Sequence, residues 1–319
     1  MQISQVMKRE GGMKNIKQIV RGGGLITSAG EVILLGKKKK ALEITRLALA
    51  YKCMKKLKRK YEKYLREFDE LWISHNHDDL LKVSSNKVWF CWFQGIDNAP
   101  TIVQRCYEAL VKNLSDKEII VLTNENLDQY VDFPPYVYEK WKEGIITNTH
   151  MTDLLRLELL IKYGGTWVDA TVFCSGNNIP DYFFDSDLFL FQCLKPGRDG
   201  HSRYISSWFI SAKTNNKVLM AVRYLLYKYW EKNKKMLDYF LLHDFFSIVL
   251  EYYPDEWKKI VPFDNSTPHI LLLRLFEIYD NVMWEAIKEQ IAFHKLTYKF
   301  DETKTKLEGT YYGKLFGNN

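Results

Sequence analysis

Three charged residues have the types and spacing needed to bind a phosphorylated ligand. Asp153 and Arg156 are three residues apart in a segment with leucines at helical spacing, so they project from neighbouring helix positions. Asp169 falls where a short apolar strand would end. Carboxylates accept hydrogen bonds from sugar hydroxyls, and a guanidinium can bind phosphate in a fork. The set suits a nucleoside diphosphate that carries a sugar. The structural alternative is a helix-surface Asp153–Arg156 pair contributing only about 0.3 to 0.5 kcal/mol.

The predicted elements around these residues are a helix, a glycine turn and a strand, over residues 149–173. Gly164 and Gly165 are expected to end the helix, because glycine enters the left-handed conformation at low cost. The β-branched and aromatic residues of 166–173 favour a strand, and Asp169 falls where its first apolar part ends. Carboxylates at the end of such a strand are well placed for ligands.

The wider pattern predicts the α/β class. A dense apolar run at 87–95 is typical of a strand buried on both faces, and 101–113 and 118–123 follow it as helix and strand. Strand, helix and strand within about 35 residues indicate a parallel βαβ unit. Other segments are assigned by the same periodicities: short helices in 126–146, strands at 188–192 and 205–211, a polar loop at 195–202 near the site, and helices at 217–230, 237–252 and, with breaks, 267–293.

Composition and cysteine usage exclude several classes. With 319 residues, 46% of them apolar and 27% charged, the chain can form one large domain or one domain with an appendage. It has no apolar run of the roughly 18 to 20 residues that a membrane helix requires, and no leader-like N-terminus, so we expect a cytoplasmic protein. Five scattered cysteines without a Cys-x-x-Cys pair indicate neither a disulfide framework nor a zinc knuckle.

The positive charge is concentrated near the N-terminus. Residues 37–66 hold thirteen Lys or Arg and two Glu, a charge of +11, so the rest of the chain carries 7 − 11 = −4. This distribution favours a local anionic contact over a body that binds nucleic acid. Apolar residues recur at helical spacing from 37 to about 81. Two interpretations stay open: docking on the anionic inner face of a membrane, or a helix packed on the body with a solvated lysine face.

Three segments are therefore expected along the chain. Residues 1–36 are a flexible N-terminus, 37–85 a basic helical extension, and 86–315 the main domain. The cluster His75–Asp79 lies between the extension and the first strand of the main domain. Because it lacks the partner spacing of a known zinc site, a solvated linker is favoured over a metal site.

Several motifs together resemble a known family. Tyr163-Gly164-Gly165-Thr166-Trp167-Val168-Asp169, preceded by Asp153 and Arg156, resembles the signature of bacterial sugar-nucleotide-dependent glycosyltransferases of the capsular polysaccharide synthesis group. That group is allied to glycosyltransferase family 32 and to the catalytic domains of the large clostridial toxins. Further similar segments are 89–95 with 98–100, 206–210, 238–243 and 294–299. The resemblance covers about residues 87–315 and is specific through the order of its pieces.

The resemblance implies a GT-A fold, which is a Rossmann-like, mainly parallel mixed sheet flanked by helices. It also implies retaining transfer of a hexose from a UDP- or GDP-sugar to a growing, lipid-linked capsular or surface polysaccharide. The basic residues 37–66 would then place the protein on the inner face of the membrane. Carried across, Asp153, Arg156 and Asp169 are the catalytic residues: the first two hold ribose and sugar hydroxyls, and Asp169 lies beside the diphosphate. The donor site would be completed by Trp92, Gln94, Gly95, Gly165, Trp208 and Lys295. Core packing is the alternative role for Trp92.

One departure from the wider superfamily affects the expected cofactor, Mn²⁺ or Mg²⁺. Where other members have Asp-x-Asp, this chain has Asp169-Ala170-Thr171. A hydroxyl is a poorer ligand than a carboxylate for a hard cation, so metal binding should be weaker or should recruit other groups. His243, Asp244 and His294 are candidates beside Asp169, and Lys295 could neutralise the leaving diphosphate directly.

Two alternatives to an active transferase remain. In the first, the domain is catalytically degenerate and serves as a scaffold in a polysaccharide-synthesising complex. In the second, the basic helix makes the chain a module that binds anionic membrane or nucleic acid, with binding that weakens steeply as salt rises.

Overall fold

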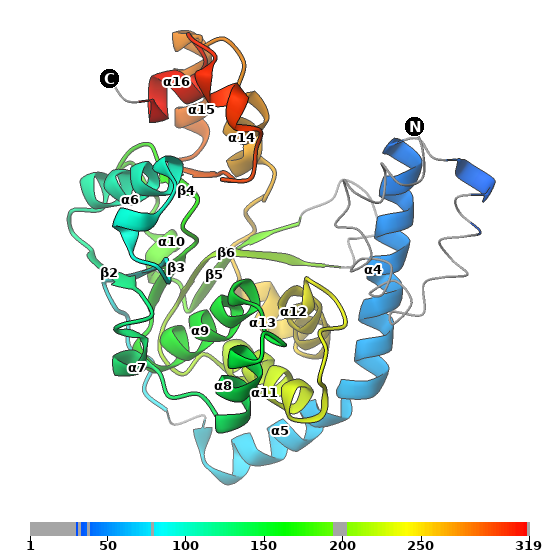
Figure 1. Ribbon diagram of the computed structural model, residues 1–319. Coiled ribbons are helices and arrows are strands. Elements are labelled where there is room, and N and C mark those ends of the chain that lie inside the picture. The colour runs from blue at the N-terminus through cyan, green and yellow to red at the C-terminus, as the bar shows by residue number, and fades with distance from the viewer. Residues whose placement is uncertain (1–29, 31–32, 37–38, 78–79, 194–202, 318–319) are drawn as a thin grey trace.

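A five-stranded mixed sheet forms the centre of the computed structural model, which describes residues 30, 33–36, 39–77, 80–193 and 203–317 (Figure 1). The strand order is β2-β1-β3-β6-β5. Strand β1 is parallel to both of its neighbours, β2 and β3, whereas β6 is antiparallel to both of its neighbours, β3 and β5. The strands are β1 (Lys87–Cys91), β2 (Glu118–Leu122), β3 (Gly165–Val168), β5 (Leu188–Gln192) and β6 (Ile205–Ala212). The predicted mainly parallel α/β architecture is confirmed.

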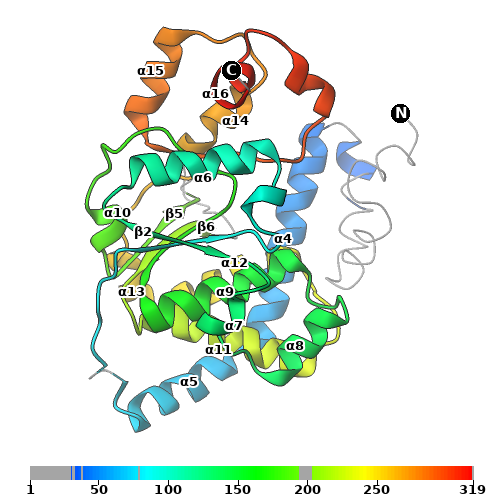
Figure 2. The ribbon, with the colours of Figure 1, turned by 60° about the vertical axis from the view of Figure 1, so that its left-hand side comes forward.

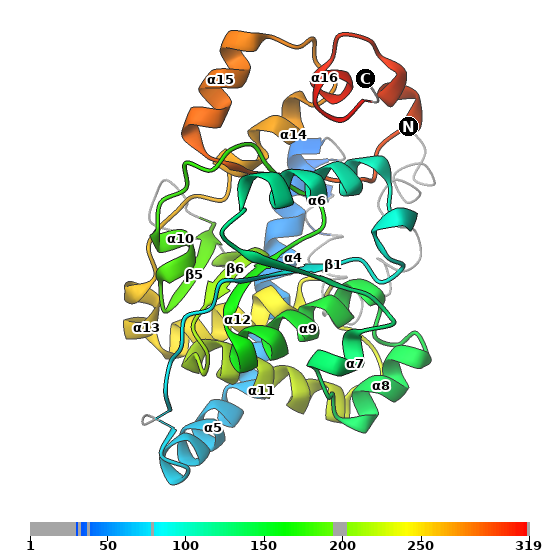
Figure 3. The same cartoon turned by 90° about the vertical axis from the view of Figure 1, so that its left-hand side faces the viewer.

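Helices cover both faces of this sheet, and the two layers lie on opposite sides of it in Figures 2 and 3. The alternation along β1 shows why: Val88 and Phe90 belong to one core, and Trp89 and Cys91 to the other. One layer contains α8 (Pro135–Lys142), α9 (Asn148–Tyr163), α11 (Lys217–Lys232) and α12 (Leu241–Tyr252). The opposite layer contains α6 (Thr101–Asn113), α10 (Tyr182–Asp185), α14 (Ile270–Arg274), α15 (Asn281–Gln290), α16 (Tyr311–Phe316) and a two-stranded sheet, β4 (Val172–Cys174) with β7 (Phe293–Lys295).

The basic N-terminal segment forms two helices, α4 (Lys39–Tyr61) and α5 (Lys63–Ser74), that pack on the first layer. The ring of Tyr61 contacts Phe245 of α12 at 5.3 Å, and the ring of Phe68 contacts Tyr224 of α11 at 5.7 Å. Their apolar stripe is thus shared with the main core, as the packed-helix interpretation expected. None of the helices in the described part of the chain is long and apolar enough to cross a bilayer.

The glycine turn predicted after the site helix is confirmed. Gly164 ends α9 with a φ of 66°, and Gly165 begins β3 with a φ of 89°. A Cβ on Gly165 would lie 2.3 Å from the carbonyl oxygen of Lys87 in β1, so only glycine permits this approach. The two glycines bring the site helix directly beside the strand that leads to Asp169.

Several element boundaries differ from the sequence expectation. The strand expected up to Phe173 is split, because β3 ends at Val168, residues 169–171 form a corner, and β4 belongs to a different sheet. The first two residues of the segment 294–299, expected only as a closing motif, belong to strand β7 (Phe293–Lys295). The helix expected from residue 237 begins at Leu241. The expected loop at 195–202 and flexible segment 1–36 lie almost wholly outside the described residues.

Candidate active site

Asp169 lies at the carboxyl end of β3, at the same edge of the sheet where β1 and β2 end. Its backbone N–H donates to the carbonyl of Trp208 in β6 at 2.8 Å, and its own carbonyl accepts from Val172 at 3.0 Å. The corner therefore holds the carboxylate fixed between two sheets. This edge is where α/β sheets of this kind bind ligands.

Arg156 joins the two predicted carboxylates. Its Nη2 lies 3.0 Å from Asp153 and 3.5 Å from Asp169. Nε donates to the carbonyl of Thr152 at 3.1 Å, and Nη1 donates to the carbonyl of Ser207. The guanidinium is buried, and its contacts orient the two carboxylates from the protein interior. Each of its three nitrogens already has a protein acceptor, which leaves little of the fork for a phosphate.

Asp169 is an ionised carboxylate at any physiological pH. Burial opposes its charge, but the cations of Lys295 and Arg156 and a hydrogen bond from Trp167 outweigh that effect and lower its pKa to about 2. The indole N–H of Trp167 donates to Oδ1 at 2.9 Å, and Lys295 Nζ lies 3.1 Å from Oδ2. Its side chain is 26% exposed, so a ligand can reach it.

A buried histidine that the sequence analysis did not single out holds Asp153. His150 Nε2 accepts from the indole N–H of Trp230 at 2.8 Å, so that nitrogen carries no proton. The proton is then on Nδ1, which lies 3.1 Å from Asp153 Oδ2 and donates to it. Trp230 and His150 therefore fix the orientation of Asp153. The signal in the sequence was the spacing of His150 three residues before Asp153, on the same helix face.

Lys295 reaches the site through the small sheet. It pairs with Val172 across β4 and β7, and the next residue, Leu296, donates its N–H to the carbonyl of Thr171 at 2.8 Å. The ammonium lies 2.7 Å from Thr171 Oγ1 as well as 3.1 Å from Asp169. Its predicted place in the site follows from this register.

The structure does not bring His294 to Asp169. Neighbouring residues of a strand face opposite sides, so His294 points away from the side that Lys295 faces. Its ring lies 5.4 Å from Trp284, and Nε2 is 2.8 Å from Ser175 Oγ. Burial lowers the pKa of His294 to about 3, so the ring is neutral. Its role in the structure is packing.

His243, at the start of α12, borders the site more closely. Burial lowers its pKa to about 4, and the charges of Asp153 and Asp169 act on it in the opposite direction. Its Nδ1 is buried without a hydrogen-bond partner among the described residues. Tyr239 lies half exposed in the preceding loop. Partial burial raises its pKa, and the negative charges of Asp153 and Asp169 raise it further.

Three expected nucleotide-contacting residues follow β1 at the same edge. Trp92 is only partly buried, and its ring lies edge-on to Tyr298 at 5.5 Å. Gln94 is exposed, and Gly95 has a φ of 81°, with open space where a Cβ would be. Tyr298 is a second aromatic residue at this edge, beside Trp92. It was not identified from the sequence, because its position depends on the path of the chain after β7.

Two other expected donor contacts lie elsewhere. Trp208 is buried in the opposite core, where it stacks on Phe191 at 4.2 Å and donates to Asn265 at 2.8 Å. It contributes its carbonyl, not its ring, to the position of Asp169. Gly165 begins β3, at the strand end away from Asp169, and its contact is with Lys87.

The residues at Asp169 offer a poor fit to the expected divalent cation. Mg²⁺ and Mn²⁺ sites are built from several oxygen ligands, and here the ammonium of Lys295 already lies against both Asp169 and Thr171. Within the described residues, the group whose ligand atoms lie within 4.8 Å of one another is Cys53, Asp238 and Asp244, and Arg203 already pairs with both of its carboxylates. His75 and His77 form no such group in that part of the chain.

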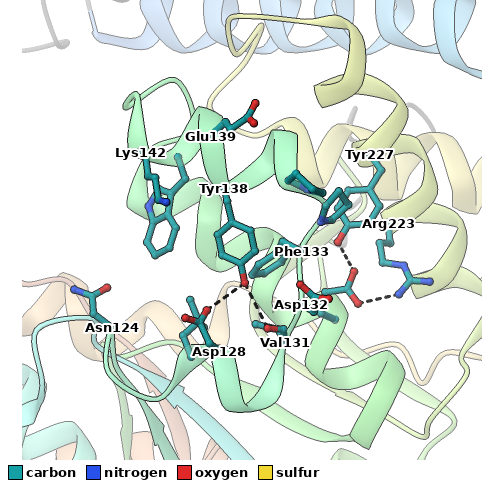
Figure 4. Close-up of a pocket in the computed structure, with 15 residues that line it drawn as sticks. Asn124, Asp128, Val131, Asp132, Phe133, Tyr138, Glu139, Lys142, Arg223 and Tyr227 are labelled. Atoms are coloured by element: carbon teal, nitrogen blue, oxygen red, sulfur yellow. Dashed lines mark hydrogen bonds and ion pairs between the residues drawn. The ribbon is translucent and has the colours of Figure 1, made fainter.

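A groove of about 1350 Å³ opens beside the site helix, between α8, α7 (Leu127–Tyr130) and α11 (Figure 4). Its rim begins at Asn124, whose N–H donates to the carbonyl of Phe93, the residue after Trp92, at 2.9 Å. Tyr138 and Asp128 lie in its centre, joined by a 3.2 Å hydrogen bond. Partly exposed aromatic rings beside carboxylates suit a polar ligand with apolar faces.

Comparison with known proteins gives one broad match and several partial ones. The profile of the family described as capsular polysaccharide synthesis protein matches residues 36–315. The match begins upstream of the segment where the motifs were recognised, so it includes the helices α4 and α5.

Two curated fungal relatives match shorter segments. O-glycosyltransferase braB of Annulohypoxylon truncatum is 28% identical over 179 residues, which are 50% of this chain and 40% of that protein. Glycosyltransferase afumC of Aspergillus fumigatus is 29% identical over 95 residues, 27% of this chain and 24% of that protein. The chain thus spans less than half of the length of either relative, although both names agree with the expected transferase class.

Among solved structures, the PaToxG glycosyltransferase aligns with 82% of this chain and 97% of its own, at 15% identity and a TM-score of 0.37. The family assignment rests on the profile instead, which spans both helical layers, the central sheet and every site residue described above. The chain belongs to the capsular polysaccharide synthesis protein family.

Proposed function

We propose that the protein is a retaining glycosyltransferase that moves a hexose from a UDP- or GDP-sugar to a saccharide acceptor. The observation that carries the proposal is the chain of charges Asp153, Arg156, Asp169 and Lys295 at the carboxyl edge of the sheet, in a member of a capsular polysaccharide synthesis family. Retention of configuration is taken from the resemblance of the motifs.

The proposed reaction exchanges one bond at the anomeric carbon. The bond from that carbon to the diphosphate oxygen breaks, and its electron pair leaves with the nucleoside diphosphate. The acceptor hydroxyl oxygen bonds to the same carbon from the same face, and its proton passes to the departing diphosphate. No side chain has to act as a nucleophile, so the protein contributes positioning and stabilisation of the negative charge that develops.

The residues divide between holding the donor and holding each other. Asp169, ionised and partly exposed, is the group that orients the donor at the reacting end, and Asp153 accepts from its hydroxyls. Arg156 keeps the two carboxylates in register. Trp92 and Tyr298 offer aromatic faces to the base, and stacking of this kind contributes roughly 1 to 3 kcal/mol per base in other proteins.

We assign the acceptor to the groove in Figure 4. It starts next to the donor edge at Asn124, and its lining combines the rings of Tyr138, Trp141 and Tyr227 with carboxylates. A growing, lipid-linked capsular or surface polysaccharide is the acceptor that agrees with the family. Its saccharide chain would lie along the groove with the reacting hydroxyl toward Asp169.

Contact with the anionic inner face of a bacterial membrane is proposed for α4. The side of this helix that faces away from the core carries Ile44, Leu47 and Tyr51, which are 41% to 53% exposed, followed by exposed Lys55 and Arg59. Apolar side chains beside cations suit an interfacial helix. Co-sedimentation with vesicles containing phosphatidylglycerol should be lost in the triple variant Ile44→Ser/Leu47→Ser/Tyr51→Ser; unchanged sedimentation would remove this part of the proposal.

The deciding experiment is a panel of UDP- and GDP-hexoses, with release of nucleoside diphosphate as the measurement. We expect release from at least one donor, increased by a suitable saccharide acceptor. Absence of release from every donor, by a protein that is folded by circular dichroism, would favour the degenerate scaffold instead.

A further inference from the structure

The corner Asp169-Ala170-Thr171 holds a cation that belongs to the chain itself. Lys295 Nζ lies 3.1 Å from Asp169 Oδ2 and 2.7 Å from Thr171 Oγ1. The pairing of Val172 with Lys295 sets the backbone position, and the Leu296 N–H to Thr171 carbonyl hydrogen bond fixes the corner against it. The ammonium is therefore positioned by two strands and is not a surface lysine that happens to lie near a carboxylate.

The charge of this corner is complete without a metal ion. Two carboxylates and a divalent cation sum to zero, and so do one carboxylate, one hydroxyl and one ammonium. Replacing a carboxylate by Thr171 and adding Lys295 thus preserves the local charge. An added divalent cation would meet one carboxylate, a hydroxyl and the repulsion of Lys295, with Arg156 also nearby.

The ammonium also retains capacity for a ligand. It has three N–H donors, and the two hydrogen bonds to Asp169 and Thr171 leave one without a partner among the described residues. The side chains of Lys295 and Asp169 are 19% and 26% exposed, so that donor is accessible from the site. Lysine binds phosphate as a point charge, and the lower dielectric of a half-buried corner strengthens that attraction.

We propose that Lys295 takes the place of a divalent cation in this enzyme: its ammonium holds Asp169 and binds the diphosphate of the donor. The inference rests on the proposed function. As the bond from the anomeric carbon to the diphosphate breaks, the ammonium stabilises the negative charge that the leaving oxygen gains. Donor binding and turnover then require no added metal.

Binding of UDP and GDP by calorimetry is the first test, in EDTA and then in Mn²⁺. We expect wild-type affinity to change by less than about threefold between the two media. Lys295→Met should weaken binding in both media by about ten- to a hundredfold, the range for losing a hydrogen bond to a charged group. Lys288→Met is the matched control, because Lys288 pairs with Glu285 on the same layer, outside the site. Wild-type binding that is lost in EDTA and restored by Mn²⁺ would overturn the inference.

A swap variant tests the exchange of one cation for another. Thr171→Asp combined with Lys295→Ser restores two carboxylates and removes the ammonium. Electron paramagnetic resonance of Mn²⁺ should show specific binding to this variant and none to the wild type. Its affinity for UDP or GDP should then depend on Mn²⁺. Wild-type Mn²⁺ binding that disappears in Asp169→Asn would contradict the inference, whatever the turnover.

Different results would remove the role of Lys295 and the glycosyltransferase activity itself. Turnover that requires Mn²⁺ would remove the role of Lys295 as the cation and leave the glycosyltransferase intact. Absence of both nucleotide binding and turnover in either medium would remove the proposed function and the inference with it.

Discussion

Two clusters combine an arginine with two carboxylates, and they differ in how their charges are balanced. At the candidate active site, Arg156 and Lys295 face Asp153 and Asp169, so cations and carboxylates are equal in number. In the second cluster, which we call the Arg203 cluster (Cys53, Arg203, Asp238 and Asp244), one cation faces two carboxylates.

The consequences for ionisation are opposite. Asp169 is partly exposed and has a pKa of about 2, whereas burial raises the pKa of Asp244 to about 7 even though Arg203 lies 2.9 Å away. One oxygen of Asp244 is buried without a partner among the described residues. The comparison indicates that a second cation and access to solvent are what make a carboxylate available for chemistry here. We interpret the Arg203 cluster, which joins α4 to α12, as structural.

Loss of either arginine should produce the largest effects. Arg156→Met and Arg203→Met each leave two carboxylates without their shared cation, and breaking buried pairs costs about 3 to 5 kcal/mol. We expect both variants to lose free energy of unfolding on that scale in urea denaturation. Only Arg156→Met should also reduce nucleotide-sugar turnover, by about 10² to 10³, the range for removing a group that stabilises developing charge.

Turnover of the folded Arg203→Met variant tests whether the two clusters have different roles. If Arg203→Met abolished turnover at a temperature where it is fully folded, the Arg203 cluster would belong to the active site.

Stability should depend on pH through Asp244. Its folded pKa lies above the unfolded value, so the folded state binds more protons between about pH 4 and 7. The contribution of Asp244 to the free energy of unfolding is therefore fully present below about pH 4 and is lost as the pH rises through about 7. Its size is on the order of 2 to 4 kcal/mol. Asp244→Asn should flatten this part of the curve of unfolding free energy against pH. An unchanged curve would place the titration elsewhere.

The stability that Asp169 contributes changes with pH in the opposite direction. Because its folded pKa is lowered, its contribution is present above about pH 4 and is lost as the pH falls toward 2. The two carboxylates thus affect separate pH ranges and can be measured independently.

The histidine that holds Asp153 should give a smaller effect, of about tenfold. In His150→Asn the amide nitrogen occupies the place of Nδ1 and can still donate to Asp153, whereas in His150→Gln the amide reaches toward Trp230 instead. Losing one hydrogen bond to a charged group corresponds to about a ten- to hundredfold change in equilibrium, and we expect the lower end because Arg156 still holds Asp153. We expect the donor KM to rise about tenfold in His150→Gln and to stay within about threefold in His150→Asn.

Nuclear magnetic resonance of the ¹⁵N-labelled imidazole tests the same contact without any substrate. The wild type should show the Nδ1–H tautomer for His150. The Nε2–H tautomer would contradict the proposed orientation of the ring.

Local patterns in the sequence were sufficient to predict the central sheet and the site helix. Strands β1, β2, β5 and β6 and helix α6 follow from apolar periodicity, and the positions of Asp153, Arg156 and Asp169 follow from helical spacing and the strand end. These features depend on residues close together in the chain, so the periodicity of apolar residues predicts them.

The parts that could not be predicted depend on contacts between distant residues. The pairing of β4 with β7, which separates Lys295 from His294, is set by residues more than a hundred positions apart. The bond from Trp230 to His150 likewise requires the packing of α11 on α9. For the same reason Trp208 was expected at the donor site, since a strand pattern does not reveal which core its ring enters.

The most direct test of the central claim is nucleoside diphosphate release from UDP- and GDP-hexoses by the wild type, Asp169→Asn and Asp244→Asn, assayed together. We predict release by the wild type and by Asp244→Asn within about threefold, and a loss of about 10² to 10³ in Asp169→Asn, measured at a temperature where that variant is folded even though it lacks the ion pairs of Asp169. Equal release by wild type and folded Asp169→Asn would contradict the assignment of this corner as the active site.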